Sequence, residues 1–188
     1  LGRAAAQKLE GCRRSLAQTL GRSVRPSEVI FTGGGTEANA MALLGIAEGA
    51  RQSNKHRTRV LISAIEHDSM LDNIPLLHAA GFTTDLILPN SHGVIEAKTL
   101  ASMMDDSVAL VSVMLANNET GAVQPIADLA ACAHEYGAYF HADAIQGFLH
   151  VPFDIDSLRI DALSLAGHKI GGPVGVGALY LKTRTPFR

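Results

Sequence analysis

Lys169 lies in an apolar and glycine-rich stretch that runs from Ala162 to Tyr180. A lysine that its neighbours shield from water tends to lose its proton, and an uncharged amine can attack an aldehyde to form a Schiff base. The stretch therefore indicates covalent carbonyl chemistry. A lysine at the exposed tip of a loop after a buried strand would give the same pattern, so this segment alone leaves both interpretations open.

Short segments rich in polar residues follow five apolar runs that are predicted to be strands. In an open parallel sheet, ligands bind beyond the carboxyl ends of the strands, so these segments would meet at one rim. They are Thr32 to Glu37, Glu66 to Asp68, Ala116 to Gly121, Ala142 to Gln146 and Gly167 to Lys169.

The segment Gly33-Gly34-Gly35-Thr36 opens a predicted helix. Unhindered backbone N–H groups, a hydroxyl and the positive end of a helix dipole together suit a phosphate group. Glycines before a helix also serve tight turns, so anion binding and turn formation are both open. The glycine and Lys-Ser/Thr spacing of a P-loop is absent.

Asp143 follows an apolar strand, where an isolated carboxylate would be costly unless it meets a cation or several donors. A protonated pyridine nitrogen is one such cation, and a ring that keeps this proton is a better electron sink. A helix N-cap or a structural ion pair is the alternative for a lone aspartate. The position of Asp143 at the shared rim favours the chemical role.

Histidines and amides supply the remaining candidates at this rim. His67 could stack on a flat ring or relay protons, because imidazole titrates near neutrality. His141 and His168 are rival histidines, and each is also explained as a hydrogen-bonded packing residue. Asn118 and Gln146 could donate to a phenolate oxygen or a substrate carboxylate, although turn formation also explains Asn118.

A metal site is a weaker interpretation of the same rim. The side chains that could act as ligands lack the His-x-x-x-His spacing of a helical site, and the charge of Lys169 would repel the ion. These side chains are Glu66, His67, Asp68, His141, Asp143 and His168. We therefore expect no metal.

The elements that would carry these residues are short β-branched runs alternating with helical patterns, which is typical of βαβ units around a mostly parallel sheet. The predicted strands are Glu28 to Phe31, Arg59 to Ile65, Thr84 to Leu88, Val108 to Leu115, Ala138 to His141, Ala162 to Leu165 and Ala178 to Lys182. The predicted helices are Leu1 to Leu20, Thr36 to Gln52, Ser69 to Ala80, Glu96 to Met104 and Ile126 to Tyr136. Ser69 with Asp72 resembles a helix cap, and Gly81 is a predicted C-cap.

The 188 residues, 47% of them hydrophobic, predict one globular domain. The net charge of −2 does not indicate binding to nucleic acid or to an acidic membrane surface. No apolar run is long enough to span a membrane and no signal peptide opens the chain, so we expect a cytoplasmic protein. Cys12 and Cys132 are too few for a disulfide framework. The chain begins inside a helix and ends after a strand, which indicates a fragment.

Five motifs in order resemble the class V aminotransferase superfamily of pyridoxal phosphate enzymes, specifically its cysteine desulfurase branch. They are TGGGTEANAMAL from Thr32, AIEHDSML from Ala64, NNETGAVQPI from Asn117, HADAIQ from His141 and LSLAGHKIGGPVGVGALYL from Leu163. The resemblance implies a three-layer α/β/α sandwich with a mostly parallel sheet and one antiparallel strand near the C-terminus. It also implies that residues 1–188 form the large cofactor-binding domain, without an N-terminal segment and a C-terminal small domain.

The resemblance further implies a role for each candidate residue. Lys169 would hold pyridoxal 5'-phosphate as a Schiff base, Asp143 would pair with its pyridinium nitrogen, and His67 would lie over the ring. Gln146 would donate to the phenolic oxygen, and Asn118 would sit near that oxygen or the substrate carboxylate. Three further residues would grip the phosphate, namely Gly35, Thr36 and His168.

In this family the substrate is L-cysteine, the product is L-alanine, and a catalytic cysteine takes the sulfur as a persulfide. The expected partners are an iron-sulfur scaffold or another sulfur acceptor protein and a second copy of the chain. The persulfide cysteine and a substrate-binding arginine belong to a part of the family pattern beyond Arg188, so we expect this chain to be inactive alone. A selenocysteine lyase, another class V enzyme and a non-catalytic scaffold are the alternatives.

One residue departs from the family pattern at the phosphate. Ala166 stands where the family usually has a serine whose hydroxyl contacts this group. The loss of one charge-assisted hydrogen bond would cost roughly 1.5 to 3 kcal/mol of cofactor binding.

Overall fold

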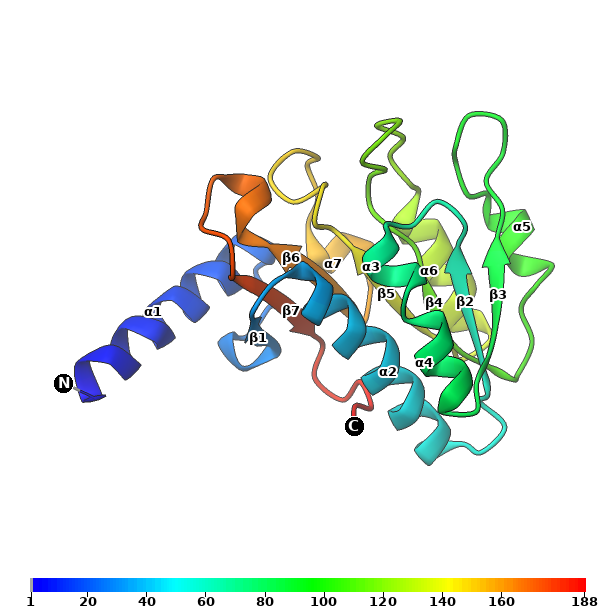
Figure 1. Cartoon of the computed structure of the whole chain (residues 1–188), viewed down its shortest axis with the longest axis horizontal. Helices are drawn as coiled ribbons and strands as arrows, with labels where there is room; N and C mark the ends of the chain where they lie inside the picture. The colour runs from blue at the N-terminus through cyan, green and yellow to red at the C-terminus, as the bar shows by residue number, and fades with distance from the viewer. Residues whose placement is uncertain (1) are drawn as a thin grey trace.

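The computed structural model describes residues 2–188 and contains a seven-stranded sheet between two layers of helices (Figure 1). The strand order is β1-β7-β6-β5-β4-β2-β3. Strands β6, β5, β4, β2 and β3 pair in parallel, whereas β7 is antiparallel to both of its neighbours. The strands are β1 (Val29–Thr32), β2 (Arg59–Ser63), β3 (Thr83–Ile87), β4 (Val108–Ser112), β5 (Tyr139–Asp143), β6 (Ala162–Ala166) and β7 (Gly177–Leu181). The predicted three-layer α/β/α fold with one antiparallel strand near the C-terminus is confirmed.

The helices divide between the two faces of the sheet. Helices α2, α3 and α4 pack on one face with Val60 and Ile62, whereas α5, α6, α7 and the end of α1 pack on the other with Leu61. The helices are α1 (Gly2–Leu20), α2 (Gly35–Ser53), α3 (Asp68–Leu71), α4 (Ile74–Ala79), α5 (Ala97–Ala101), α6 (Ile126–Glu135) and α7 (Ile155–Leu158), with 3-10 turns η1 (Pro26–Glu28) and η2 (Gly167–Ile170). Consecutive residues of a strand point to opposite faces of the sheet, so one strand contributes side chains to the hydrophobic core on each face.

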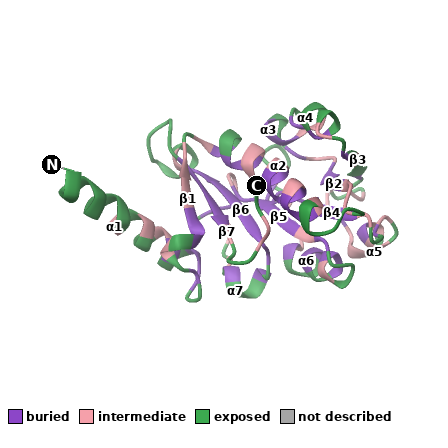
Figure 2. Cartoon of the chain, turned by 90° about the horizontal axis from the view of Figure 1, so that it is seen from below, coloured by how far each residue is buried: buried purple, intermediate pink, exposed green. Residues whose placement is uncertain are grey.

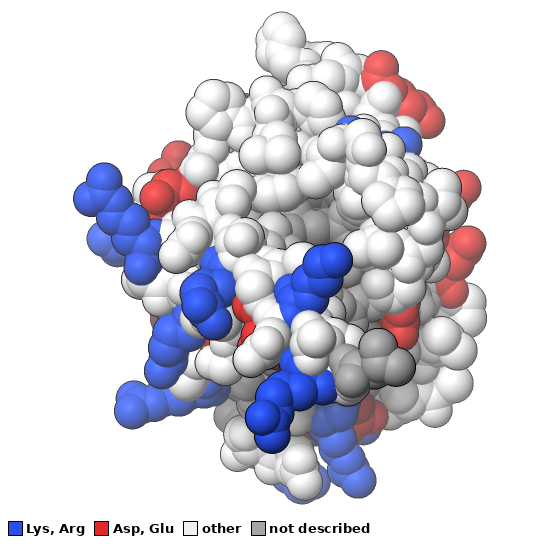
Figure 3. Space-filling view, turned by 90° about the vertical axis from the view of Figure 1, so that its left-hand side faces the viewer, with Lys and Arg blue, Asp and Glu red and all other residues white. Residues whose placement is uncertain are grey.

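Figure 2 shows how burial follows this division. The central strands β4, β5 and β6 are almost fully buried, the edge strands β1 and β3 are partly exposed, and the first half of α1 is exposed and projects from the sheet. The face around α1 also gathers Lys and Arg side chains (Figure 3), and α1 itself carries Arg3, Lys8, Arg13 and Arg14 against the single acid Glu10. The small net charge of the whole chain therefore hides an uneven distribution. None of the described helices is both long and apolar enough to cross a membrane.

The helix predicted over Ser69 to Ala80 is two short helices in the structure. Helix α3 ends at Leu71, and α4 begins at Ile74 with Pro75 in its first turn. A proline lacks the N–H that a continuous helix needs and is accommodated in a first turn, which explains the break. The predicted cap by Ser69 and Asp72 is wrong, because His67 caps α3. Gly81 does follow α4 in a left-handed conformation, with φ of 84°, as predicted.

Several other predicted boundaries change. The helix predicted over Glu96 to Met104 is limited to α5, and the strand predicted to reach Leu115 ends at Ser112. Helix α7 was absent from the predictions because its four residues are too few to show a helical period. The part of the first predicted helix at Leu1 lies outside the described residues. The end of β4 moves from Leu115 to Ser112 and that of β5 from His141 to Asp143, but the candidate residues still lie at or just beyond the carboxyl ends of the strands.

Candidate functional site

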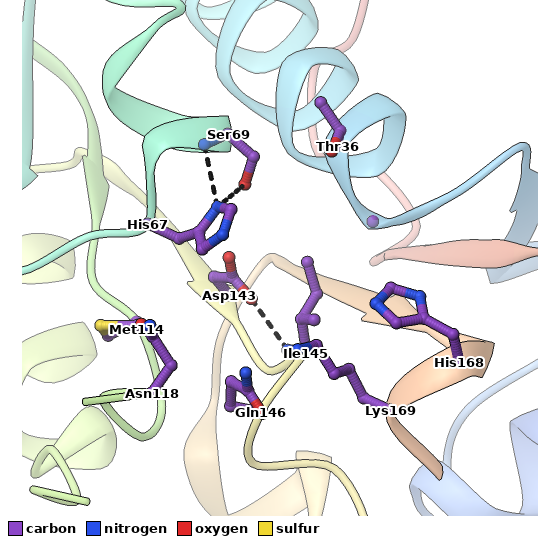
Figure 4. Close-up of a pocket in the computed structure, with 11 residues that line it drawn as sticks. Thr36, His67, Ser69, Met114, Asn118, Asp143, Ile145, Gln146, His168 and Lys169 are labelled. Carbon is purple, nitrogen blue, oxygen red and sulfur yellow. Dashed lines mark hydrogen bonds between the residues drawn. The ribbon is translucent and has the colours of Figure 1, made fainter. Parts of the chain in front are cut away.

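The residues that follow β2, β4, β5 and β6 meet the start of α2 around one pocket (Figure 4). All eight site residues predicted from the sequence line it, together with three that were not predicted. The lining residues are Gly35, Thr36, His67, Ser69, Met114, Asn118, Asp143, Ile145, Gln146, His168 and Lys169. Segments up to 134 positions apart in the sequence therefore form a single site, as expected at this edge of a parallel sheet.

Asp143 is the last residue of β5 and is only 4% exposed. One carboxylate oxygen accepts from the backbone N–H of Ile145 at 2.8 Å, and the other accepts from the side-chain amide of Asn39 at 2.8 Å. Burial raises the pKa of Asp143, while these two hydrogen bonds and nearby His67 act in the opposite direction. The hydrogen bond to Ile145 makes a local turn and not the helix N-cap of the alternative interpretation, since the next helix begins at Ile155, and Asp143 also lines the pocket.

His67 lies between β2 and α3, and its ring is fixed by capping this short helix. The ring nitrogen Nδ1 accepts from the Ser69 N–H at 3.0 Å, and the Ser69 hydroxyl accepts from Asn39 at 3.0 Å. Asn39 donates from the same amide group to Asp143. A continuous network therefore connects His67 with Asp143, which lie side by side in Figure 4.

Gly35 begins α2, and its lack of a side chain allows the start of this helix to pack closely at the pocket. A Cβ atom built there would meet Ile145 Cδ1 at 2.3 Å and Ala166 Cβ at 3.2 Å, so a larger residue would force these side chains apart. Thr36 follows on the first turn and is exposed. The N–H groups at the start of this 19-residue helix and this hydroxyl are donors of the kind that suits an anion.

Lys169 and His168 lie on η2, directly after β6, and both line the pocket. The expectation that neighbours shield the Lys169 amine from water is wrong for this chain, because residues 168–176 are all exposed. The buried strand ends at Ala166, so the apolar sequence that precedes Lys169 covers β6 and not the lysine. Lys169 is therefore an exposed residue after a buried strand, as the second interpretation predicts, and it also lines the pocket, while its covalent role stays a prediction.

The two predicted amides lie on adjacent loops. Gln146 follows β5 and is partly buried, whereas Asn118 is exposed. The neighbouring Asn117 makes the turn there, since its side-chain oxygen accepts from the N–H groups of Glu119 and Thr120. Asn118 does not make these turn contacts, and it lines the pocket.

His141 is a buried packing residue and does not line the pocket. Its two ring nitrogens lie 2.8 Å from the hydroxyl oxygens of Ser112 and Ser164, on the strands either side of β5. Burial lowers the pKa of His141 to about 3, so the ring is neutral. In residues 2–188, no three or more His, Cys, Asp and Glu side chains form a group that could hold a metal ion.

Sequence reasoning missed several residues of the site. Ser69, Met114 and Ile145 line the pocket, and Asn39 holds Asp143 from behind. Asn39 did carry a signal, because it is a polar residue inside the apolar stretch Ala38 to Ala47 and is fully buried in α2. A buried amide requires partners, so its presence indicated a polar group on the facing strand. Ser69 was expected only as part of a helix cap, and the apolar Met114 and Ile145 could not be distinguished from core residues by sequence.

Known proteins match this chain over nearly its whole length. An IscS-like cysteine desulfurase of Mycobacterium tuberculosis is 42% identical over 184 residues, which is 96% of this chain and 46% of that protein. The cysteine desulfurase of Homo sapiens is 38% identical over 180 residues, 96% of this chain and 38% of that protein. This chain thus spans half or less of the length of the relatives that it matches.

Solved structures agree with these relatives. A structure described as SspA in complex with cysteine has a TM-score of 0.87 and 35% identity, and covers 96% of this chain and 50% of its own. A NifS-like protein has a TM-score of 0.92 and 32% identity, and covers 100% of this chain and 50% of its own. The sequence profile of the aminotransferase class-V family matches residues 1–186. The chain belongs to the aminotransferase class-V family.

Proposed function

We propose that this chain is the cofactor-binding part of a pyridoxal phosphate-dependent cysteine desulfurase, which converts L-cysteine to L-alanine and passes the sulfur on for iron-sulfur cluster assembly. The single observation that carries the proposal is the convergence of an amine, a buried carboxylate, an imidazole and a helix N-terminus on one pocket, from Lys169, Asp143, His67 and Gly35. The names of the relatives supply the substrate class.

The donor set of the pocket fits pyridoxal phosphate. Asp143 is buried yet accepts only one hydrogen bond on each oxygen, so lone pairs are left for a ring N–H. At the other end, Gly35 allows α2 to pack closely on Ile145 and Ala166, and the start of α2 offers N–H groups to a phosphate. The group, when bound, supplies an electron sink for the bonds around the substrate α-carbon.

Each residue then has a defined task. Lys169 would hold the cofactor through Nζ, and its free amine would serve as the group that moves a proton at this end of the pocket. Asp143 keeps the proton on the ring nitrogen, and His67, oriented by the Ser69 N–H, covers the ring. Gln146 and Asn118 donate to the phenolic oxygen and the substrate carboxylate. The phosphate is held by the Gly35 N–H, the Thr36 hydroxyl and His168.

The sulfur acceptor is assigned to a cysteine outside these 188 residues. Cys12 is exposed on α1 and Cys132 is buried on α6, and neither lines the pocket. The proposal includes an iron-sulfur scaffold or other acceptor protein as partner, a homodimer and a cytoplasmic setting.

Pyridoxal phosphate binding followed by borohydride reduction tests the proposal. We expect a visible absorption band on addition of the cofactor, and a pyridoxyl group on Lys169 after reduction and peptide mapping. Lys169→Ala should abolish both, whereas Lys98→Ala, which changes an exposed lysine paired with Glu96, should keep both. Label spread over surface lysines, or no band at all, would favour a non-catalytic scaffold.

A further inference from the structure

A second buried carboxyl lies near Asp143 and has no role in the proposed site. Glu66 follows β2, immediately before His67, and is 7% exposed. It does not line the pocket that Asp143 faces. Two carboxylates in one apolar region repel each other and cannot both be ionised at low cost, so one of the pair should keep its proton.

The hydrogen bonds show which of the two keeps it. Glu66 Oε1 accepts from the Ser63 hydroxyl and from the Met114 N–H at 2.6 Å, whereas Oε2 is buried with no hydrogen-bond partner among the described residues. An ionised carboxylate would leave charge on this unpaired buried oxygen, which costs far more than a neutral hydroxyl there, so the pattern favours a protonated acid whose carbonyl oxygen Oε1 accepts both hydrogen bonds. Asp143 instead accepts on both of its oxygens, as an ionised carboxylate does.

The same contacts fix the geometry of the rim. Ser63 ends β2 and Met114 follows β4, and these two strands pair in parallel. Glu66 therefore ties two neighbouring strand ends together at the point where the chain turns into His67. Burial, followed by the charge of Asp143, raises the pKa of Glu66 to about 8. Asp143 is the charged group that acts on it, and the remaining contacts are neutral.

We propose that Glu66 is a positioning residue: as a neutral acid it joins the ends of β2 and β4, directs the chain into His67, and leaves the negative charge beneath the pocket on Asp143. The part of this inference that concerns the bound ring rests on the proposed function. The protonation of Glu66 itself does not.

Unfolding measurements without cofactor test the neutral acid. Glu66 is protonated in both folded and unfolded chains below pH 4.5, and the unfolded chain loses this proton first as the pH rises towards about 8. Wild type should therefore lose stability relative to Glu66→Gln across this window. Glu119→Gln, which changes an exposed carboxyl at the same rim, should show the same dependence of stability on pH as wild type. A stability difference between Glu66→Gln and wild type that stays flat across the window would overturn the proposal.

Infrared spectroscopy gives a readout that does not depend on the stability of a variant. At neutral pH wild type should show the band of a protonated carboxyl group in a dry environment, and Glu66→Gln should lack it. Absence of the band from folded wild type would also overturn the proposal.

Cofactor titration tests positioning. Glu66→Ala leaves the Met114 N–H without its acceptor and should weaken pyridoxal phosphate binding about tenfold, while the neutral Gln keeps an acceptor and should restore binding to within about twofold. Equal weakening by both changes would mean that a negative charge is needed and would overturn positioning by a neutral acid. If wild type itself binds no cofactor, the proposed function fails, while the first two measurements still decide the state of Glu66.

Discussion

At the scale of single residues, Ala166 offers the most direct test of the phosphate end. Its side chain lies against the start of α2, since a Cβ atom at Gly35 would approach it to 3.2 Å. A hydroxyl at this position could donate to an anion held by the helix. We therefore expect Ala166→Ser to bind pyridoxal phosphate about tenfold more tightly, because hydrogen bonds to charged groups contribute about 1.5 to 3 kcal/mol.

Titration of the visible absorption band measures this change. Ala178→Ser, on the neighbouring strand and equally buried at 3% exposure, is the control for the cost of burying a hydroxyl. It should not tighten binding. Unchanged affinity in Ala166→Ser would show that the hydroxyl does not reach the phosphate.

His141 makes a second prediction at this scale, on acid stability. Its pKa falls from an ordinary 6.5 to about 3 on folding, because burial between Ser112 and Ser164 disfavours the charged ring. The stability from the neutral ring is complete above pH 6.5. It is lost as the pH falls towards 3, since the unfolded chain takes up a proton that the folded chain does not. We expect a slope of about 1.4 kcal/mol per pH unit from this group.

Urea unfolding at a series of pH values measures the slope. His141→Gln removes the titrating ring and should reduce the pH dependence between 6.5 and 3, whatever its effect on stability at neutral pH. His56→Gln, at an exposed position, is the matched control and should leave the slope as it is. The same slope in wild type and His141→Gln would contradict the assignment.

At the scale of elements, the start of α2 must approach Ile145 and Ala166 closely. Gly35→Ala would place a Cβ atom 2.3 Å from Ile145 Cδ1, so the helix or the loop after β5 must move. We expect a loss of stability of about 1 to 3 kcal/mol, as for other overpacked sites, with weaker cofactor binding. Gly34→Ala is the matched control, because a Cβ atom at Gly34 meets no atom within 4 Å and its φ of 162° is extended backbone. Equal effects of the two changes, measured by denaturant unfolding and cofactor titration, would show that close packing at Gly35 is not the cause.

The elements also show how far sequence reasoning reaches. Apolar runs and the polar residues after them predicted the sheet and the rim, because strand ends of a parallel sheet meet wherever the loops lead. Local sequence could not decide whether Lys169 is shielded or exposed, because its exposure depends on the short η2 turn that carries it past the buried end of β6. Nor could it predict the contact of Asn39 with Asp143, since two residues 104 positions apart meet only once α2 packs across the sheet.

At the scale of the whole molecule, the site is open on one side. Asp143 lies on the buried sheet, whereas Lys169, His168 and the segment 171–176 are exposed. Catalysis of carbanion chemistry benefits from the exclusion of water, which this side of the pocket does not provide. We therefore expect the 188-residue chain to bind the cofactor without catalysing turnover.

Addition of L-cysteine to the cofactor-loaded chain tests this expectation. The substrate amine should displace Lys169 and change the visible spectrum, because the residues proposed to contact the ring line the pocket. Sulfide release should stay below one equivalent per chain. Neither Cys12 nor Cys132 lines the pocket, so neither is placed to take the sulfur. The double variant Cys12→Ser, Cys132→Ser should give the same spectral change as wild type. Sustained sulfide release that disappears in the double variant would mean that one of these cysteines reaches the site, and that the exposed rim closes over the substrate.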